Sequence, residues 1–517
     1  MNIRKVYLGL IAILSVALFY EWTSDSRAES VVDHLEVAKV ENLKPQVSDD
    51  GLYVYLENDL LKLKIAIQTG SIVESRLKEY GVENVEGSMG VRVFGSSETG
   101  SFKYYLKTGF TGQPSKYVLN NYGDSFVILK SKDGDLTKEF GFLPNTYEVL
   151  VKDSSDNGVG GKPFASLYRT EGRSLDLKTA VIEGGMMNNS SYQGVVISSD
   201  QDPYLSSRLR SIDEPFSVLS RSGWVSFIQK YFFAVLIGSD DYVYNYFAQP
   251  ANSGTYRMGY TVEKGEATNL VYSHSHRVFI GPKIRKDLAQ RADNLELSID
   301  MGWFWFISQP MVWFLDLINE YVNSWALSII IFTLILKLAL FPVTAKGFAS
   351  MAGMRKVGPM MKDIQDRHKN DRQKASAEVM ALYKKEGVNP LGGCLPVLAQ
   401  MPFFIGFFFA LREMVELRHA SFYWISDLSI PDPLFILPVL FGLVMVSTQK
   451  LSPAPPTSDP TQAQVMKYMP VVFSIFFFIF PAGLCLYSVV NSGFSLGQQR
   501  YLYKKTGVLG DVGSGGS

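Results

Sequence analysis

The chain of 517 residues is poor in cysteine, carries no excess of either charge and lacks the short motifs of common enzymes. Its two cysteines cannot build a disulfide framework, so stability must come from apolar burial or from a membrane. Fifty basic and fifty acidic residues give a net charge of zero, which argues against nucleic acid as a partner. Aromatic residues make up 13% of the chain, which excludes a disordered protein.

Motifs for phosphate binding and covalent catalysis are also missing. The string Gly160-Gly161-Lys162-Pro163 lacks both the spacing and the hydroxyl of a P-loop, and there is no nucleophile elbow. His274 and His276 can share one face of a strand, but no further ligand lies nearby, which favours a surface or core strand over a metal site. We therefore expect a protein that is not an enzyme, with no catalytic residue, metal or cofactor.

What is present begins with an apolar N-terminal segment. Arg4 and Lys5 precede an apolar run over residues 6–20, a pattern typical of a signal peptide or an uncleaved signal anchor. Ser26-Arg27-Ala28 offers a cleavage site, but it lies late, so we predict a retained anchor over residues 1–22. Whether the segment is cleaved or retained, the residues after it are exported, because the positively charged Arg4 and Lys5 stay on the cytoplasmic side.

The sequence pattern of residues 51–298 is typical of a soluble β-rich domain, which a polar linker over residues 23–50 joins to the anchor. Runs at residues 52–56 and 62–67 alternate apolar and polar side chains, the period of half-buried strands. Asp133-Gly134 and Asn157-Gly158 are turn signals between such strands. The pattern predicts a large exported, periplasmic antiparallel β-sandwich.

The remaining chain is apolar and predicts an α-helical, polytopic membrane region. Residues 302–320 indicate an amphipathic helix at the membrane interface. A core over residues 324–503, followed by a cytoplasmic tail over residues 504–517, contains five apolar segments that predict membrane spans: 324–343, 394–411, 433–448, 465–480 and 484–502.

The charges of the connecting segments predict the orientation. Residues 346–393 carry ten Lys or Arg against five Asp or Glu and are expected on the cytoplasmic side, whereas residues 412–432 carry two against four. Together with the N-terminal anchor this gives six spans with both termini in the cytoplasm.

Lys337 is the only basic residue well inside a predicted span. A charge at that depth costs about 3 kcal/mol on insertion scales unless it meets water or a partner. Thr333 lies one turn away on the same helix face, which makes that face polar. Lys337 therefore lines a functional, water-filled cavity or, alternatively, extends its ammonium group to the cytoplasmic headgroups.

Gln400 lies inside the next predicted span, between Pro396 and Pro402. An amide in lipid should face other helices or a cavity, so Gln400 either makes a structural bond between helices or extends the polar site of Lys337.

The segment at residues 346–390 predicts a cytoplasmic helical hairpin. Methionines among basic residues make an adaptable surface for varied apolar partners, and the alternative is a solvated face that contacts anionic lipids. The candidate recruiting residues are Met354, Arg355, Met360, Met361 and Lys362.

Several motifs resemble those of the YidC family of membrane protein insertases. They are Asn389-Pro390-Leu391-Gly392-Gly393-Cys394 with Gln400-Met401-Pro402, Trp424-Ile425-Ser426-Asp427-Leu428, Gln449-Lys450-Leu451-Ser452-Pro453 and Phe480-Pro481-Ala482-Gly483-Leu484. The similarity runs from about residue 302 to 503, and the long exported insert resembles the Gram-negative form with its periplasmic β-super-sandwich.

This resemblance implies five spans around a hydrophilic groove that is open to the cytoplasm and to lipid. Lys337 stands where family members carry a groove arginine, so the positive charge is kept, but the two-pronged hydrogen bonding of a guanidinium is lost. Thr333 and Gln400 match other groove positions, and Ser488 replaces an aromatic residue found after Tyr487 in some relatives. The implied partners are nascent membrane proteins, the Sec translocon, the ribosome or signal recognition pathway and the inner-membrane bilayer.

Two other functions remain open from the residues alone. The exported domain could be the active part of a membrane-anchored sugar-binding or carbohydrate-active protein. A solute transporter is the second alternative, against which stand the missing coupling carboxylates and the absence of obvious inverted repeats.

Overall fold

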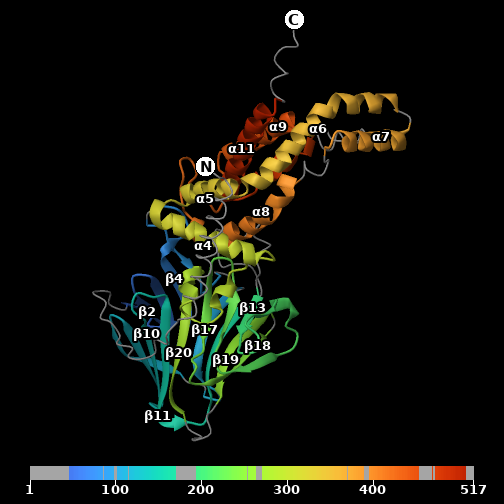
Figure 1. Ribbon diagram of the computed structural model, residues 1–517. Helices are drawn as coiled ribbons and strands as arrows, with labels where there is room; N and C mark the ends of the chain where they lie inside the picture. The colour runs from blue at the N-terminus through green and yellow to red at the C-terminus, as the bar shows by residue number, and fades with distance from the viewer. Residues whose placement is uncertain are drawn as a thin grey trace. The chain divides into compact units, whose positions relative to one another are not determined.

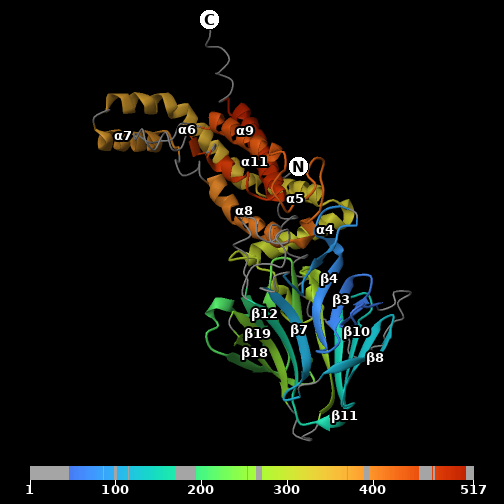
Figure 2. The same ribbon diagram turned by 180° about the vertical axis from the view of Figure 1, so that it is seen from behind.

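The computed structural model describes residues 46–507 except 86, 98–101, 114–115, 171–193, 253, 264–270, 369–370, 389–394, 453–467 and 470–471. The predicted anchor at residues 1–22 and most of the predicted linker lie outside the described residues. The described chain forms two compact units, one ending at Asp300 and the other beginning at Met301. Figures 1 and 2 show a β-rich unit and a helical unit.

The β unit is built from two antiparallel sheets, which confirms the predicted sandwich. Sheet A, in spatial order, contains β1 (Gln46–Val47), β2 (Tyr53–Glu57), β3 (Leu61–Ala66), β4 (Ser71–Gly81), β7 (Lys103–Phe110), β12 (Pro163–Thr170), β19 (Thr255–Glu263), β18 (Val243–Asn252) and β15 (Phe216–Ser220), with β5 (Gly90–Arg92) and β6 (Gly95–Ser96) beside β4 and β7. Sheet B contains β14 (Leu205–Ser207), β13 (Gly194–Ser198), β16 (Trp224–Ile228), β17 (Phe232–Ile237), β20 (Val271–Pro282), β11 (Glu148–Val159), β10 (Leu136–Phe142), β9 (Phe126–Ser131) and β8 (Tyr117–Gly123).

Sequence alternation explains which side chains fill this sandwich. Every second residue of β3 is buried, in keeping with its alternating sequence. All residues of β17 are buried, and its sequence is accordingly a continuous apolar run. Gly134 has φ of 83° in the connection from β9 to β10, as the Asp133-Gly134 signal predicts. The prediction of a turn at Asn157-Gly158 is wrong, because β11 continues through it with an irregular register between Ser154 and Val159.

Short helical segments complete the β unit, and longer helices form the second unit. The segments are η2 (Leu209–Ser211), α3 (Arg285–Leu288) and η3 (Leu295–Ser298). The helical unit contains α4 (Trp305–Val322), α5 (Trp325–Ala339), α6 (Phe341–Arg367), α7 (Arg372–Lys385), α8 (Leu395–Glu413), η5 (Val415–Leu417), α9 (Ile436–Leu451) and α11 (Ala482–Lys505).

The predicted span at residues 324–343 is divided by a bend of 66° between α5 and α6. Pro342 lies at the start of α6, where its missing N–H group is tolerated and where it disfavours a continuous helix from the preceding turn. The first helix of the hairpin therefore begins at Phe341, five residues before its predicted start. In the described part of the chain, no straight helix has both the length and the apolar character of a membrane span, although α5 and α6 qualify as a bent pair and α9 is a shorter apolar helix.

Candidate functional site

The side chain of Lys337 is held between three helices of the second unit. Its ammonium group, on α5, donates hydrogen bonds to Gln400 Oε1 on α8 at 2.9 Å and to Ser495 Oγ on α11 at 2.6 Å. Lys337 is only 1% exposed, whereas Gln400 and Ser495 are partly exposed. The ammonium group is therefore closed off from a larger ligand in this conformation.

Both acceptors of Lys337 are neutral. No carboxylate pairs with the ammonium group in the described chain, so its positive charge is solvated by oxygen dipoles and is not cancelled. A buried charge without a counter-ion is costly, and such an arrangement is typical of a functional site. The structure thus brings together Lys337 and Gln400, and adds Ser495.

Ser495 is not among the residues that the sequence patterns indicate for this site. A usable signal exists, because Ser495 follows Ser488 by seven residues and lies on the same face of α11. Neither Thr333 nor Ser488 bonds to Lys337: their hydroxyl groups donate to Ile329 O and Leu484 O, each one turn back on its own helix.

Aromatic rings close the interface of the same three helices next to this polar site. Phe332 of α5 stacks on Phe407 of α8 with ring centroids 5.3 Å apart, and Phe407 lies 4.5 Å from Tyr487 of α11. Phe332 precedes Lys337 by five residues, which is about 7.5 Å along a helix axis. Tyr487 is therefore part of an apolar layer beside the polar site and not a hydrogen-bonding partner of Lys337 in the described chain.

The hairpin of α6 and α7 has an apolar core of its own. Met354, Met361 and Tyr383 are buried there, and the Tyr383 hydroxyl donates to Met361 Sδ at 3.2 Å. The interpretation of Met354 and Met361 as surface methionines is therefore wrong, because they hold the two helices together. Met360 and Lys362 are exposed and remain candidates for recruitment.

Arg355 is also engaged within the helical unit. Its guanidinium donates to the carbonyl of Leu451 at the end of α9 at 2.8 Å and lies 5.9 Å from the ring of Tyr503 on α11. This residue ties the first hairpin helix to the rest of the unit, so its contacts in the structure are packing contacts.

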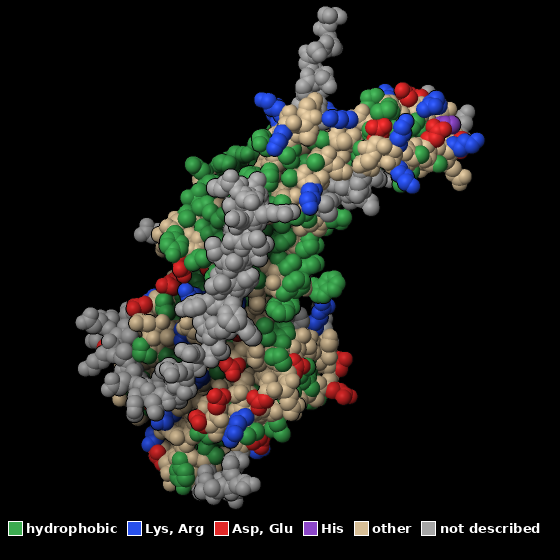
Figure 3. All heavy atoms as spheres, in the orientation of Figure 1, with side chains coloured by type: hydrophobic (Ala, Val, Ile, Leu, Met, Phe, Trp, Pro, Cys, Tyr) green, Lys and Arg blue, Asp and Glu red, His purple; other side chains and the backbone are tan. Residues whose placement is uncertain are grey.

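The surface of the helical unit separates apolar from charged side chains (Figure 3). Hydrophobic side chains gather around α8 and its neighbours, whereas Lys, Arg, Asp and Glu gather on the hairpin. Exposed apolar residues in this unit include Leu398, Met401, Leu443, Ile475 and Phe476. Large exposed apolar areas mark contact with a membrane or another protein.

In the β unit, His274 and His276 lie in the core, as one of the two structural alternatives predicted. The Lys138 ammonium lies 2.6 Å from Asp153 Oδ1, and His276 Nε2 lies 3.4 Å from Asp153 Oδ2. Tyr260 of the opposite sheet is 3.0 Å from His276 Nδ1. This buried cluster joins the two sheets, and no group of residues suited to hold a metal ion occurs in the part of the chain that the structure describes.

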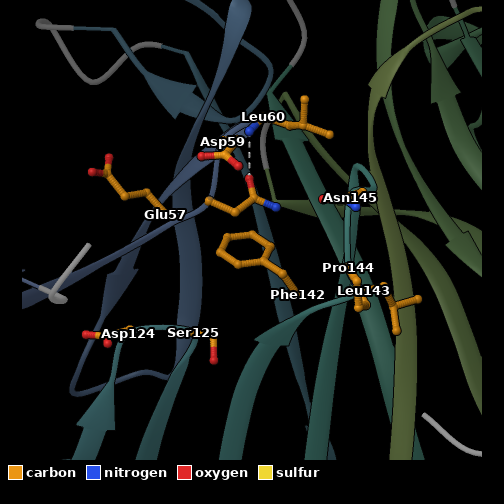
Figure 4. Close-up of a pocket in the computed structure, with 10 residues that line it drawn as sticks. Glu57, Asp59, Leu60, Asp124, Ser125, Phe142, Leu143, Pro144 and Asn145 are labelled. Carbon is orange, nitrogen blue, oxygen red and sulfur yellow. Dashed lines mark hydrogen bonds between the residues drawn. The ribbon is translucent and has the colours of Figure 1, made fainter. Parts of the chain in front are cut away.

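A small pocket lies where three strand connections of the β unit meet (Figure 4). Phe142 and Leu60 contribute apolar surface, and Glu57, Asp59 and Asp124 contribute carboxylates. Figure 4 shows the carboxylates of Glu57 and Asp124 well apart and both turned away from Phe142, and Glu57 also pairs with Lys62 at 3.3 Å. The pocket therefore does not focus negative charge on one ligand position.

Comparison with known proteins connects the two units to one family. Residues 53–314 match the family model described as the YidC periplasmic domain, and residues 317–508 match the 60Kd inner membrane protein family. The membrane protein insertase YidC of Azotobacter vinelandii is 35% identical over 482 residues, covering 87% of this chain and 84% of that protein. The chain belongs to the YidC family.

Further YidC relatives match almost end to end. The YidC of a Marinomonas species is 33% identical and aligns over 98% of this chain and 99% of its own length. A crystal structure of an active YidC insertase, with its first transmembrane domain resolved, covers 97% of this chain at 19% identity with a TM-score of 0.41. The curated relatives at 33–35% identity are membrane protein insertases, and the match over residues 53–314 is to a periplasmic domain, so the chain is a membrane protein insertase with a periplasmic domain.

Proposed function

We propose that Lys337, Gln400 and Ser495 form the polar site that receives the exported hydrophilic part of a nascent membrane protein. The observation that carries this proposal is the buried ammonium group whose only acceptors in the described chain are two neutral side chains. Polar or acidic groups of a substrate can replace Gln400 and Ser495 as acceptors, because neither is bound to Lys337 by opposite charge.

The insertion step needs no covalent chemistry. A polar site inside the bilayer shortens the apolar distance that a hydrophilic tail must cross. The apolar segment of the substrate then transfers to lipid, and burial of about 20 apolar residues supplies the driving force. The exposed apolar side chains around α8 and α9 support a lipid-facing surface beside this path.

The same proposal includes six spans, the N-terminal anchor and five in the core, with both termini in the cytoplasm of the inner membrane. Cysteine labelling tests this topology in a variant whose two native cysteines are replaced. Tyr423 and Met380 are 87% and 57% exposed, so single cysteines at these positions are accessible to reagent. We expect an impermeant maleimide added outside spheroplasts to label position 423 and not position 380. Labelling of both from the outside contradicts the proposed orientation.

Purified protein in proteoliposomes tests the role of Lys337. We expect Lys337→Arg to insert substrates normally, because it keeps the charge, and Lys337→Met to insert substrates with acidic exported tails several-fold less. Lys450→Met, which removes a lysine from the end of α9, is the matched control. Equal insertion of every such substrate by Lys337→Met excludes the cation from the mechanism.

Crosslinking identifies the path directly. A photoreactive residue at position 400 or 495 should capture a stalled nascent chain, whereas the same residue at the exposed position 272 of the β unit should not. Deletion of residues 60–290 separates the insertase from a sugar-binding alternative, because insertion by the remaining helical unit places the activity there. We further propose that the Sec translocon and the ribosome or signal recognition pathway deliver substrates to this site.

A further inference from the structure

The outward face of sheet A carries an arginine that is preorganised by aromatic rings. The guanidinium of Arg257, on β19, lies 4.9 Å from the ring of Phe247, 5.3 Å from Phe164 and 5.7 Å from Tyr168. Its Nε donates to Ser166 Oγ at 3.1 Å. We call these five residues the Arg257 cradle.

Strand register explains how the cradle forms. Tyr168 of β12 pairs with Arg257 of β19, and in the next outward row Ser166 pairs with Gly259, which in turn pairs with Phe247 of β18. Gly259 lets the backbone of β12 come close, because a Cβ there would lie within 2.1 Å of Ala165 O. The guanidinium therefore lies near three aromatic rings, with its four terminal N–H groups unbonded in the described chain.

Two lysines on the same face, Lys64 and Lys107, also form no ion pair in the described chain. The outward row through Arg257 and Tyr168 continues to Tyr105, whose ring stacks on Tyr168 at 5.0 Å, and Lys107 lies two residues further along β7. Lys64 of β3 lies 4.0 Å from the ring of Tyr53. None of Lys64, Lys107 and Arg257 lies within 4.0 Å of a carboxylate of the described residues, although Lys64 faces Glu74 across β3 and β4 and interacts electrostatically with Asp50. Arg76 on the same face pairs with Glu74 at 2.7 Å.

This basic face belongs to a chain segment whose overall charge is negative. Residues 23–301 hold 30 Lys or Arg and 36 Asp or Glu. Figure 2 shows β3, β4, β7, β12, β19 and β18 side by side. Lys64 on β3 and Arg257 on β19 are four strands apart, which corresponds to roughly 20 Å at the usual strand spacing. An extended polypeptide of about seven residues covers that distance.

We propose that the outward face of sheet A binds an acidic, extended polypeptide segment, with Arg257 as its main contact. A planar guanidinium with free N–H groups matches a carboxylate bidentately, and Tyr, Phe and Arg are enriched in the cores of protein interfaces. A lipid surface fits less well. Tyr105 and Tyr168 stack with their ring planes 3° apart, and Phe247 lies 4.9 Å from the Arg257 guanidinium, whereas side chains that enter a bilayer protrude from the surface.

Fluorescence anisotropy with the full-length protein in phosphatidylcholine nanodiscs tests this surface. The probe is a fluorescein-labelled peptide of twelve alternating Glu and Ser residues, and the reference is the same peptide with Gln in place of Glu. We expect the acidic peptide to bind and the Gln peptide not to bind. Arg257→Gln should raise Kd about tenfold and Arg257→Lys by a smaller factor, since it keeps the charge but loses the fork.

Lys152→Gln is the matched control, because Lys152 is exposed on β11 of the other sheet and its replacement changes the net charge equally. Its effect on Kd should be less than about twofold. Hydrogen exchange of β12 and β19 checks that Arg257→Lys and Arg257→Gln stay folded. If Arg257→Gln and Lys152→Gln weaken binding of the acidic peptide equally, the proposal is wrong. It is also wrong if an equal concentration of monomeric dihexanoyl phosphatidylglycerol displaces the peptide, because headgroup phosphate would then be the ligand.

Discussion

The ammonium group of Lys337 donates a 2.6 Å hydrogen bond to the hydroxyl of Ser495, across 158 residues of chain. This contact joins α5 to α11, and the second bond from Lys337, to Gln400, joins α5 to α8. One charged side chain therefore links three helices through neutral acceptors.

Loss of the Ser495 hydroxyl should destabilise the helical unit. Ser495→Ala removes an acceptor from a buried ammonium group, which costs about 1–3 kcal/mol. Unfolding of the detergent-solubilised protein by SDS measures this change. Ser447→Ala is the control, because Ser447 is exposed on α9 and donates only to its own helix at Leu443 O. A similar loss in both variants would contradict a specific role for Ser495.

The charge on Lys337 should matter more than its exact hydrogen bonds. Gln400→Glu places a carboxylate where the amide oxygen lies 2.9 Å from the ammonium group, so it neutralises the cation with little change in volume. Gln400→Met removes the acceptor and leaves the charge. We expect insertion of substrates with acidic tails to fall several-fold in Gln400→Glu and less in Gln400→Met, measured by protease protection in proteoliposomes. The reverse order would show that the amide, not the charge, is required.

Acid should destabilise the β unit through its buried cluster. Burial opposes ionisation of Asp153, but the Lys138 ammonium and the His276 imidazole outweigh it and lower the pKa of this carboxyl group. Burial lowers the pKa of His276, and burial together with His276 lowers the pKa of His274 to about 3. The folded domain then binds fewer protons than the unfolded chain, so its stability is present at neutral pH and falls as the pH drops below about 6.5.

Hydrogen exchange of β10, β11 and β20 at pH 7.5 and 5, corrected for intrinsic rates, measures this loss. Asp153→Asn should cost about 3–5 kcal/mol at pH 7.5, because it leaves Lys138 buried without its counter-ion. Asp156→Asn, at a side chain that is 67% exposed, should change little. Protection that does not depend on pH would contradict the assigned charge states.

The hairpin should open when its methionine core is disturbed. Met361→Ser leaves a cavity between α6 and α7 and exposes a hydroxyl to apolar neighbours, which should cost about 2–5 kcal/mol. Met380→Ser, at a position 57% exposed on α7, should have almost no effect. Amide exchange of both hairpin helices measures the difference. Unchanged protection in Met361→Ser would show that the helices do not depend on each other.

Local sequence patterns predicted part of this structure. Strand alternation indicated the sandwich, and an isolated lysine within an apolar segment indicated the polar site. Met354, Val357, Met361 and Ile364 also follow a spacing of three and four residues, which is typical of a packed helix face. Composition alone suggested an adaptable surface there, and the periodicity was the better guide.

Residue type and spacing along the sequence determined that a charge lies inside an apolar segment, that a β-rich domain is exported and that a basic hairpin follows. Only the tertiary structure decided that Ser495 contacts Lys337, that Thr333 and Ser488 bond to their own helices, and that Arg257 lies among three rings. The reason is physical. Periodicity follows from the geometry of one element and is written in nearby residues, whereas these contacts depend on which faces of distant elements pack together.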